Sequence, residues 1–131
     1  DPSKKILRRQ KTLVLVDTSI WIKHLSKNLP LLEEFLNEGS VLCHSCVLGE
    51  LALGNLKNRG EILGLLSELP RSQHASNSEV MQFVESNKLY SRGIGWVDAH
   101  LLAAAKLSAC SLWSLDTILI STAKSLRIVF V

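Results

Sequence analysis

Apolar runs alternate along the chain with segments of helical spacing. The run LVLV at residues 13–16 is rich in valine and leucine and ends abruptly at Asp17. A run that is apolar at every position is typical of a strand buried on both faces of a parallel sheet. Further strands are predicted at 41–43, 111–115 and 127–131.

Helices are predicted between these strands. Pro30 can open one helix and Gly39 ends it, whereas Ser45 and either Asn77 or Ser78 are the predicted N-caps of two others. The predicted helices are 18–26, 30–38, 45–53, 59–69, 79–89, 97–109 and 117–125. Strands that alternate with helices indicate an α/β fold with a parallel sheet and helices on both of its faces.

The acidic residues fall into two groups according to their neighbours in the sequence. Of the twelve, eight are terminal or lie among polar residues, as on solvated helix faces. The other four are embedded in apolar sequence: Asp17 in LVLVDTSIW, Glu50 in CVLGELALG, Asp98 in GWVDAHLLAAA and Asp116 in LWSLDTILI. Asp17 and Asp116 end strands, and the carboxyl ends of parallel strands are where ligands bind. Helix capping alone would also explain Asp17 or Asp98.

Four converging carboxylates imply a cation. Like charges brought together destabilise one another, and a buried unpaired carboxylate is costly. Oxygen ligands without a nearby His or Cys pair select Mg²⁺ or Mn²⁺. Such an ion commonly serves phosphate chemistry by polarising a phosphoryl oxygen and activating water. No serine or cysteine nucleophile with a base is evident, so hydrolysis by water is favoured.

The composition indicates one domain with a substantial core. The chain has 131 residues, of which 47% are hydrophobic. No apolar stretch approaches the roughly 18 residues of a membrane span, and no signal peptide is evident, so we expect a cytoplasmic protein. Three cysteines, an odd number, indicate reduced thiols. The CxxC spacing from Cys43 to Cys46 lacks the second ligand pair of a structural zinc site.

Positive charge is concentrated near the N-terminus. The formal net charge is +3, and five basic residues lie within a leader at 1–12: Lys4, Lys5, Arg8, Arg9 and Lys11. A polyanionic partner, a solvated leader or a cloning remnant would each explain this cluster. Net charge alone does not establish nucleic-acid binding.

The four acidic motifs, in this order, resemble the PIN-domain ribonucleases, and most closely the VapC toxins of VapBC toxin–antitoxin pairs. The resemblance covers residues 13–131, nearly the whole chain. It implies a PIN-like three-layer sandwich with a mainly parallel central sheet. It also implies that one or two Mg²⁺ or Mn²⁺ ions, held by an acidic cluster, activate water to cut RNA. The implied cluster consists of Asp17, Glu50, Asp98 and Asp116.

The resemblance implies supporting residues as well. Ser19 matches the small hydroxyl residue that orients the first acid, and Ser114 would support Asp116 or a metal-bound water. Helix capping and strand-end polarity are the alternatives for these two serines. Arg92 could contact an RNA phosphate and Trp96 could stack on a base. A solvated loop residue and packing beside the glycines are the alternatives for these two.

The resemblance further implies partners. These are an RNA substrate, a second copy of the chain in a homodimer, and a cognate VapB-type antitoxin. The apolar surface of residues 20–35 exceeds what one core-facing stripe needs, so we expect the antitoxin to contact it. That the surface belongs to the core is the alternative.

Other classes fit the sequence less well. A haloacid-dehalogenase-like phosphatase needs a second aspartate two residues after Asp17, where this chain has Ser19. A receiver domain needs an acidic pair after its first strand and a late lysine, and neither is evident. A PIN-like RNA-binding or scaffold module without catalysis is the main alternative. Such a module can lose acids without penalty, so the presence of all four acids favours catalysis. A DNA flap nuclease or ribosome-biogenesis nuclease also stays open.

Overall fold

Three parallel strands form the centre of the fold in a computed structural model that describes residues 12–130. They are β1 (Val14–Val16), β2 (Val41–Leu42) and β3 (Ser111–Trp113), in the order β2-β1-β3. Single bridges from Cys43 to Arg71 and from Leu112 to Val129 extend the sheet on either side. The predicted parallel sheet is therefore confirmed.

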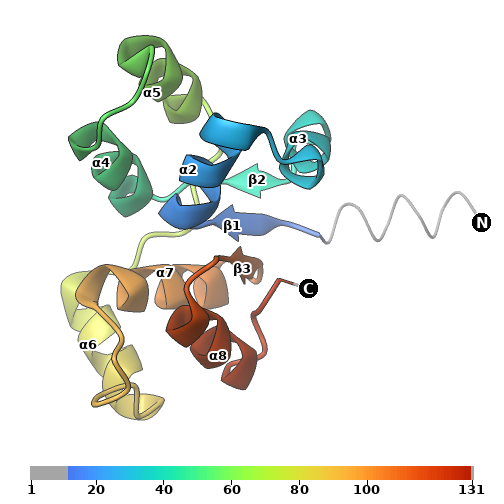
Figure 1. The fold of residues 1–131 in the computed structure, drawn as a ribbon. Coiled ribbons are helices and arrows are strands. Elements are labelled where there is room, and N and C mark those ends of the chain that lie inside the picture. Colours follow the sequence, from blue (N-terminus) through green and yellow to red (C-terminus); the bar gives the residue numbers. More distant parts are fainter. Residues whose placement is uncertain (1–11, 131) are drawn as a thin grey trace, which may run out of the picture.

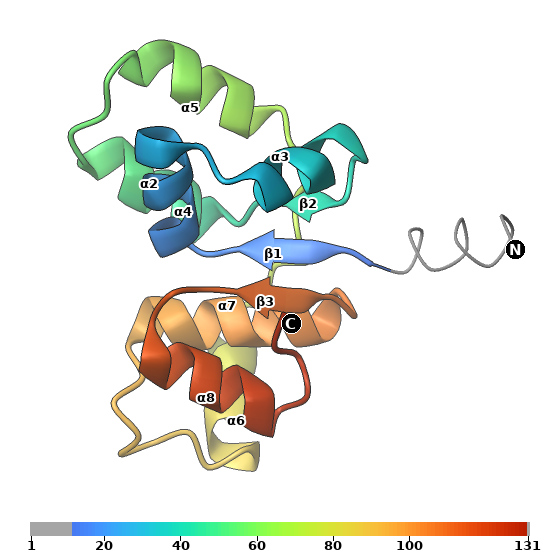
Figure 2. The same cartoon turned by 45° about the vertical axis from the view of Figure 1, so that its right-hand side comes forward.

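Seven helices of residues 12–130 flank this sheet. Helices α2 to α5 lie on the β2 side, and α6 to α8 lie on the β3 side (Figures 1 and 2). Their bounds are α2 (Thr18–Lys27), α3 (Pro30–Asn37), α4 (Ser45–Leu53), α5 (Arg59–Ser67), α6 (Asn77–Ser86), α7 (Trp96–Leu107) and α8 (Thr117–Ser125). The predicted α/β class, with helices around a parallel sheet, is confirmed.

The core is built around β1. Every residue of β1 is fully buried, as expected for a strand with a neighbour on each side and helices packed over it. Helix α7 packs against β1 and β3 and buries three successive alanines, Ala103 to Ala105. Small side chains let this helix approach the sheet closely, which fixes the position of its first turn relative to the strand ends.

Two predicted helix caps are wrong. The N-cap of α4 is His44, not Ser45, because the His44 ring nitrogen Nδ1 accepts a hydrogen bond from the backbone N–H of Cys46. The N-cap of α6 is Ser76, whose side chain forms a reciprocal capping box with Glu79. In both cases the cap lies one or two residues before the predicted one.

The last predicted strand is present only as one bridge. Val129 pairs with Leu112, and the backbone N–H of Phe130 donates to the Leu112 carbonyl. Arg127 has a positive φ of 61°, which interrupts extended backbone just before this pairing. Val131 and the basic residues of the leader lie outside the described residues.

The three cysteine sulfurs form no disulfide, as predicted for reduced thiols. Cys43 and Cys110 are buried and Cys46 is half-buried. Burial raises the pKa of the Cys110 thiol to about 11, which keeps it protonated at neutral pH. Across residues 12–130, no helix has the length and apolarity that crossing a membrane requires.

Candidate active site

The four acids singled out in the sequence come from four different elements. Asp17 follows β1, Glu50 lies within α4, Asp98 lies in the first turn of α7, and Asp116 precedes α8. Because β1 and β3 are parallel neighbours, Asp17 and Asp116, which follow them, lie at the same carboxyl end of the sheet. Helices α2 and α8 begin at this end (Figure 1). Helix α4 packs against both α2 and α7, which carries Glu50 toward the same end.

Asp98 shows that these carboxylates share one electrostatic environment. Its pKa is raised, first by burial and then by the negative charges of Asp17, Asp116 and Glu50. A backbone hydrogen bond from Gly95 opposes this rise. The charges of the other three acids therefore all act on Asp98.

Asp17 is the N-cap residue of α2, but its side chain makes no capping hydrogen bond and is held by two serine hydroxyls. Ser19 and Ser114 both donate to its Oδ2 atom, at 2.8 and 2.7 Å. Each serine oxygen in turn accepts a backbone N–H, from Leu115 and Asp116 respectively, at 3.0 Å. With an incoming N–H on each oxygen, both hydroxyl hydrogens are directed to the carboxylate.

Ser114 therefore contacts a different acid from the one expected. Its hydroxyl donates to the Asp17 carboxylate, whereas Asp116 contacts Ser114 only through its backbone N–H, which donates to the Ser114 hydroxyl oxygen. The two serine oxygens lie 3.4 Å apart and converge on one oxygen of Asp17. Asp17 itself is 93% buried by this arrangement, since its exposed fraction is 7%.

Glu50 and Asp116 are exposed although their sequence neighbours are apolar. The hydroxyl of Thr18 donates to Glu50 Oε1 at 2.7 Å, a contact that the sequence did not suggest. Asp116 Oδ1 caps α8 by accepting the backbone N–H groups of Ile118 and Leu119. Only some of their apolar neighbours pack into the core: Val47 and Leu51 beside Glu50, and Leu119 after Asp116, are buried.

The donor set fits a hard cation. Within residues 12–130, the hydrogen bonds to Asp17, Glu50 and Asp116 fall on one oxygen of each carboxylate, which leaves the second oxygen for a ligand. Among these residues, no group of three or more Asp, Glu, His or Cys side chains is arranged so that it could hold a metal ion. Mg²⁺ usually takes only one or two protein carboxylates directly and keeps several waters, so a wider cluster suits it.

The remaining predicted residues lie at the border of the cluster or away from it. Arg92 is exposed in the segment before α7, and Trp96, the first residue of α7, is 45% exposed. His100, four residues after Trp96 on α7, is buried and its Nε2 atom lies 3.1 Å from the side-chain oxygen of Asn77. The ring of Trp96 packs edge-on against His100, with centroids 4.8 Å apart.

Comparison with known proteins establishes the family. The PIN domain model matches residues 14–128, so the chain belongs to the PIN-domain family. The chain is also 40% identical over 105 residues to Ribonuclease VapC32 of Mycobacterium tuberculosis, in strains CDC 1551 / Oshkosh and ATCC 25618 / H37Rv. That alignment covers 79% of this chain and 85% of the relative. The resemblance to VapC-type PIN ribonucleases is thereby confirmed.

A solved structure supports the fold independently. The crystal structure of PAE2754 from Pyrobaculum aerophilum superposes with a TM-score of 0.58 and covers 88% of this chain and 87% of its own. Sequence identity is 15%, so this likeness concerns the fold alone.

Proposed function

We propose that the protein is a metal-dependent endoribonuclease of the toxin type that hydrolyses RNA phosphodiester bonds. The observation that carries the proposal is the placement of four acids from four different elements around the carboxyl ends of β1 and β3, where burial and then the other three charges raise the pKa of Asp98. The name of the mycobacterial relative, a ribonuclease, supports the choice of RNA as substrate.

Asp17, Glu50, Asp98 and Asp116 would hold one or two Mg²⁺ or Mn²⁺ ions. Such an ion supplies Lewis-acid stabilisation of the phosphoryl oxygens and a water of lowered pKa. Asp17 offers its Oδ1 atom, because the two serine hydroxyls hold Oδ2. These hydroxyls fix the plane of the carboxylate, so its free oxygen points in one direction when the ligand arrives.

RNA is expected to approach over the start of α7. Arg92 would contact a phosphate, and Trp96 offers an exposed aromatic face for a base. Both residues precede Asp98 by a few positions, so a strand that contacts them passes the acidic cluster.

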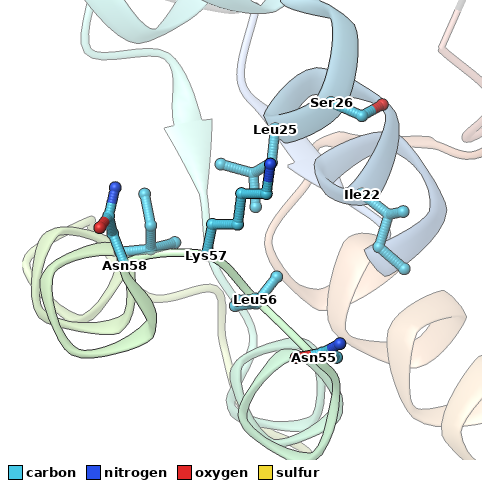
Figure 3. A pocket seen from close by; sticks show the side chains of 8 residues that line it. Ile22, Leu25, Ser26, Asn55, Leu56, Lys57 and Asn58 are labelled. Carbon is cyan, nitrogen blue, oxygen red and sulfur yellow. The ribbon is translucent and has the colours of Figure 1, made fainter.

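The antitoxin would bind at a hollow of about 550 Å³ between α2 and the segment that joins α4 to α5 (Figure 3). Ile22 and Leu25 of α2 are exposed there, with fractions of 55% and 38%, and the side chain of Lys57 extends toward α2. This surface suits an amphipathic peptide with apolar side chains and an acidic residue. It overlaps the surface of residues 20–35 that the sequence indicated.

Cleavage of total RNA by the purified protein tests the proposal. With Mg²⁺ or Mn²⁺ we expect discrete fragments, and with excess chelator we expect intact RNA. Intact RNA in both, from protein shown to be free of antitoxin, would contradict catalysis. RNA binding without cleavage would then favour the non-catalytic RNA-binding or scaffold module.

A further inference from the structure

A small hollow of about 190 Å³ lies where α6, the segment after it and the first turn of α7 meet. The chain has seven aromatic residues, all within the described part. Only two of them are exposed, Tyr90 at 54% and Trp96 at 45%, and both line this hollow. Met81, which is 54% exposed, lines it as well. Two exposed aromatics at one concave place mark a binding surface more strongly than scattered apolar residues do.

The hollow shares a wall with the acidic cluster. Gly95 lines the hollow, and a Cβ atom at this position would lie 3.7 Å from Asp98 Oδ2. Trp96 follows Gly95 directly, and its edge-on packing against the buried ring of His100 fixes its orientation. A group bound in the hollow would therefore lie beside the Asp98 carboxylate.

The segment that forms the hollow is positively charged. Residues 87–95 contain two exposed cations, Lys88 and Arg92, and no acid. The backbone φ is positive at Lys88, Ser91 and Gly93, so the segment turns repeatedly and is not helical. Aromatic faces beside cations are the combination by which proteins bind unstacked bases and the phosphates that join them.

We propose that this hollow binds one unstacked base of single-stranded RNA, with Tyr90 and Trp96 as stacking partners. The phosphates on either side of that base would lie near Lys88 and Arg92. The inference rests on the proposed ribonuclease function and deepens it, since it requires a single-stranded substrate at this place. A paired base cannot enter, because both of its faces are already stacked in a duplex.

Fluorescence anisotropy with a short, labelled, random-sequence single-stranded RNA tests this site in the presence of chelator, where binding is measured without cleavage. Tyr90→Leu and Trp96→Leu keep apolar bulk but remove the aromatic face, so each should weaken binding roughly tenfold. Tyr90→Phe and Trp96→Phe keep the face and should bind as the wild type does. Leu53→Ala is a matched control, because Leu53 is 91% exposed and lies on α4, away from the hollow.

Leucine variants that bind RNA as tightly as the wild type would overturn the proposal. So would a wild-type dimer in sedimentation velocity that becomes a monomer in either leucine variant, because a second copy of the chain would then cover this surface. Failure of the ribonuclease function gives a different result: the wild type would leave RNA intact with Mg²⁺ or Mn²⁺, whatever the variants bind.

Discussion

Asp17 receives both of its side-chain hydrogen bonds on a single oxygen. The donors, Ser19 and Ser114, are 95 residues apart in the chain, and each is itself held by a backbone N–H. Such a pair fixes the orientation of the carboxylate. We interpret the two serines as positioning residues for Asp17.

Ser114→Ala should lower the rate of metal-dependent RNA cleavage about tenfold or more while leaving the fold intact, because groups that orient a ligand typically matter to this extent. Cleavage rates across a Mn²⁺ titration measure the effect. Ser121→Ala, at an exposed position on α8, is the control. A Ser114→Ala enzyme as active as this control would show that the hydroxyl does not position Asp17.

In the absence of metal, the charged form of Asp98 is destabilised by burial and then by the three neighbouring acids. Because its pKa is raised in the folded protein, the folded state holds its proton more tightly than the unfolded state does. Stability therefore falls as pH rises from the usual pKa of an aspartate through the raised pKa of Asp98, and it stays lowered at neutral pH.

Asp98→Asn should therefore raise the melting temperature of the metal-free protein at pH 7 by a few degrees. Added Mg²⁺ or Mn²⁺ should raise the melting temperature of the wild type, and should do so much less in the variant. Thermal unfolding with and without metal measures both effects. An equal metal response in the two proteins would count against Asp98 as a ligand.

The residues of the candidate site were predicted more easily than their contacts. Four acids within apolar sequence stand out because carboxylates are rarely placed there without a reason. The serine pair on Asp17 and the bond from Thr18 to Glu50 connect distant parts of the chain, and no local pattern reveals them. Burial was also misjudged for Glu50 and Asp116, because an apolar sequence neighbour can lie on another face of the element.

At the scale of elements, α4 depends on a buried histidine. His44 is 2% exposed, and its ring accepts the backbone N–H of Cys46 at the start of the helix that carries Glu50. Burial, and then the positive charges of His74, His100 and Arg71, together lower its pKa to about 4. His44 is therefore neutral in the folded protein at neutral pH.

Acidification should unfold the protein partly through His44. The unfolded state takes up a proton near pH 6.5 and the folded state only near pH 4, so stability is lost as pH falls between these values. The loss from pH 7 to pH 5 is about 2 kcal/mol for such a shift. His44→Asn keeps a capping oxygen but cannot titrate, so its urea midpoint should fall less over this range. Equal falls in both proteins would contradict this role.

Helices were predicted more accurately than the edges of the sheet. Pro30 and the apolar periodicity of α7 and α8 are local signals, and the observed helices match them closely. The prediction of the last strand was wrong because the length of a strand depends on its partner. The partner here is the three-residue strand β3, which pairs with the last segment only through the Leu112–Val129 bridge. The predictions of two N-caps were wrong because the position of a cap depends on which side chain reaches a backbone N–H.

At the scale of the whole molecule, the candidate site joins the two sets of helices. Glu50 comes from the set on the β2 side, whereas Asp98 and Asp116 come from the set on the β3 side (Figure 2). Asp17 stands between them at the end of the central strand. The sheet is thus the element that sets the spacing of the carboxylates.

None of the four carboxylates lines the proposed antitoxin hollow, so the two functions should be separable. Ile22→Asp should weaken binding of the cognate antitoxin at least tenfold, since it places a charge on the apolar surface. Calorimetry with the antitoxin measures this, and RNA cleavage should be unchanged. Unaltered antitoxin affinity would place the contact elsewhere.

Mn²⁺ binding, followed by electron paramagnetic resonance in four single variants, tests whether the four acids form one metal site. Asp17→Asn, Glu50→Gln, Asp98→Asn and Asp116→Asn each remove one charge, and Glu85→Gln does so at an exposed position on α6. If the four acids form one site, each of the four weakens Mn²⁺ binding and Glu85→Gln does not. Wild-type affinity in the Glu50 or Asp116 variant would contradict a single four-carboxylate site.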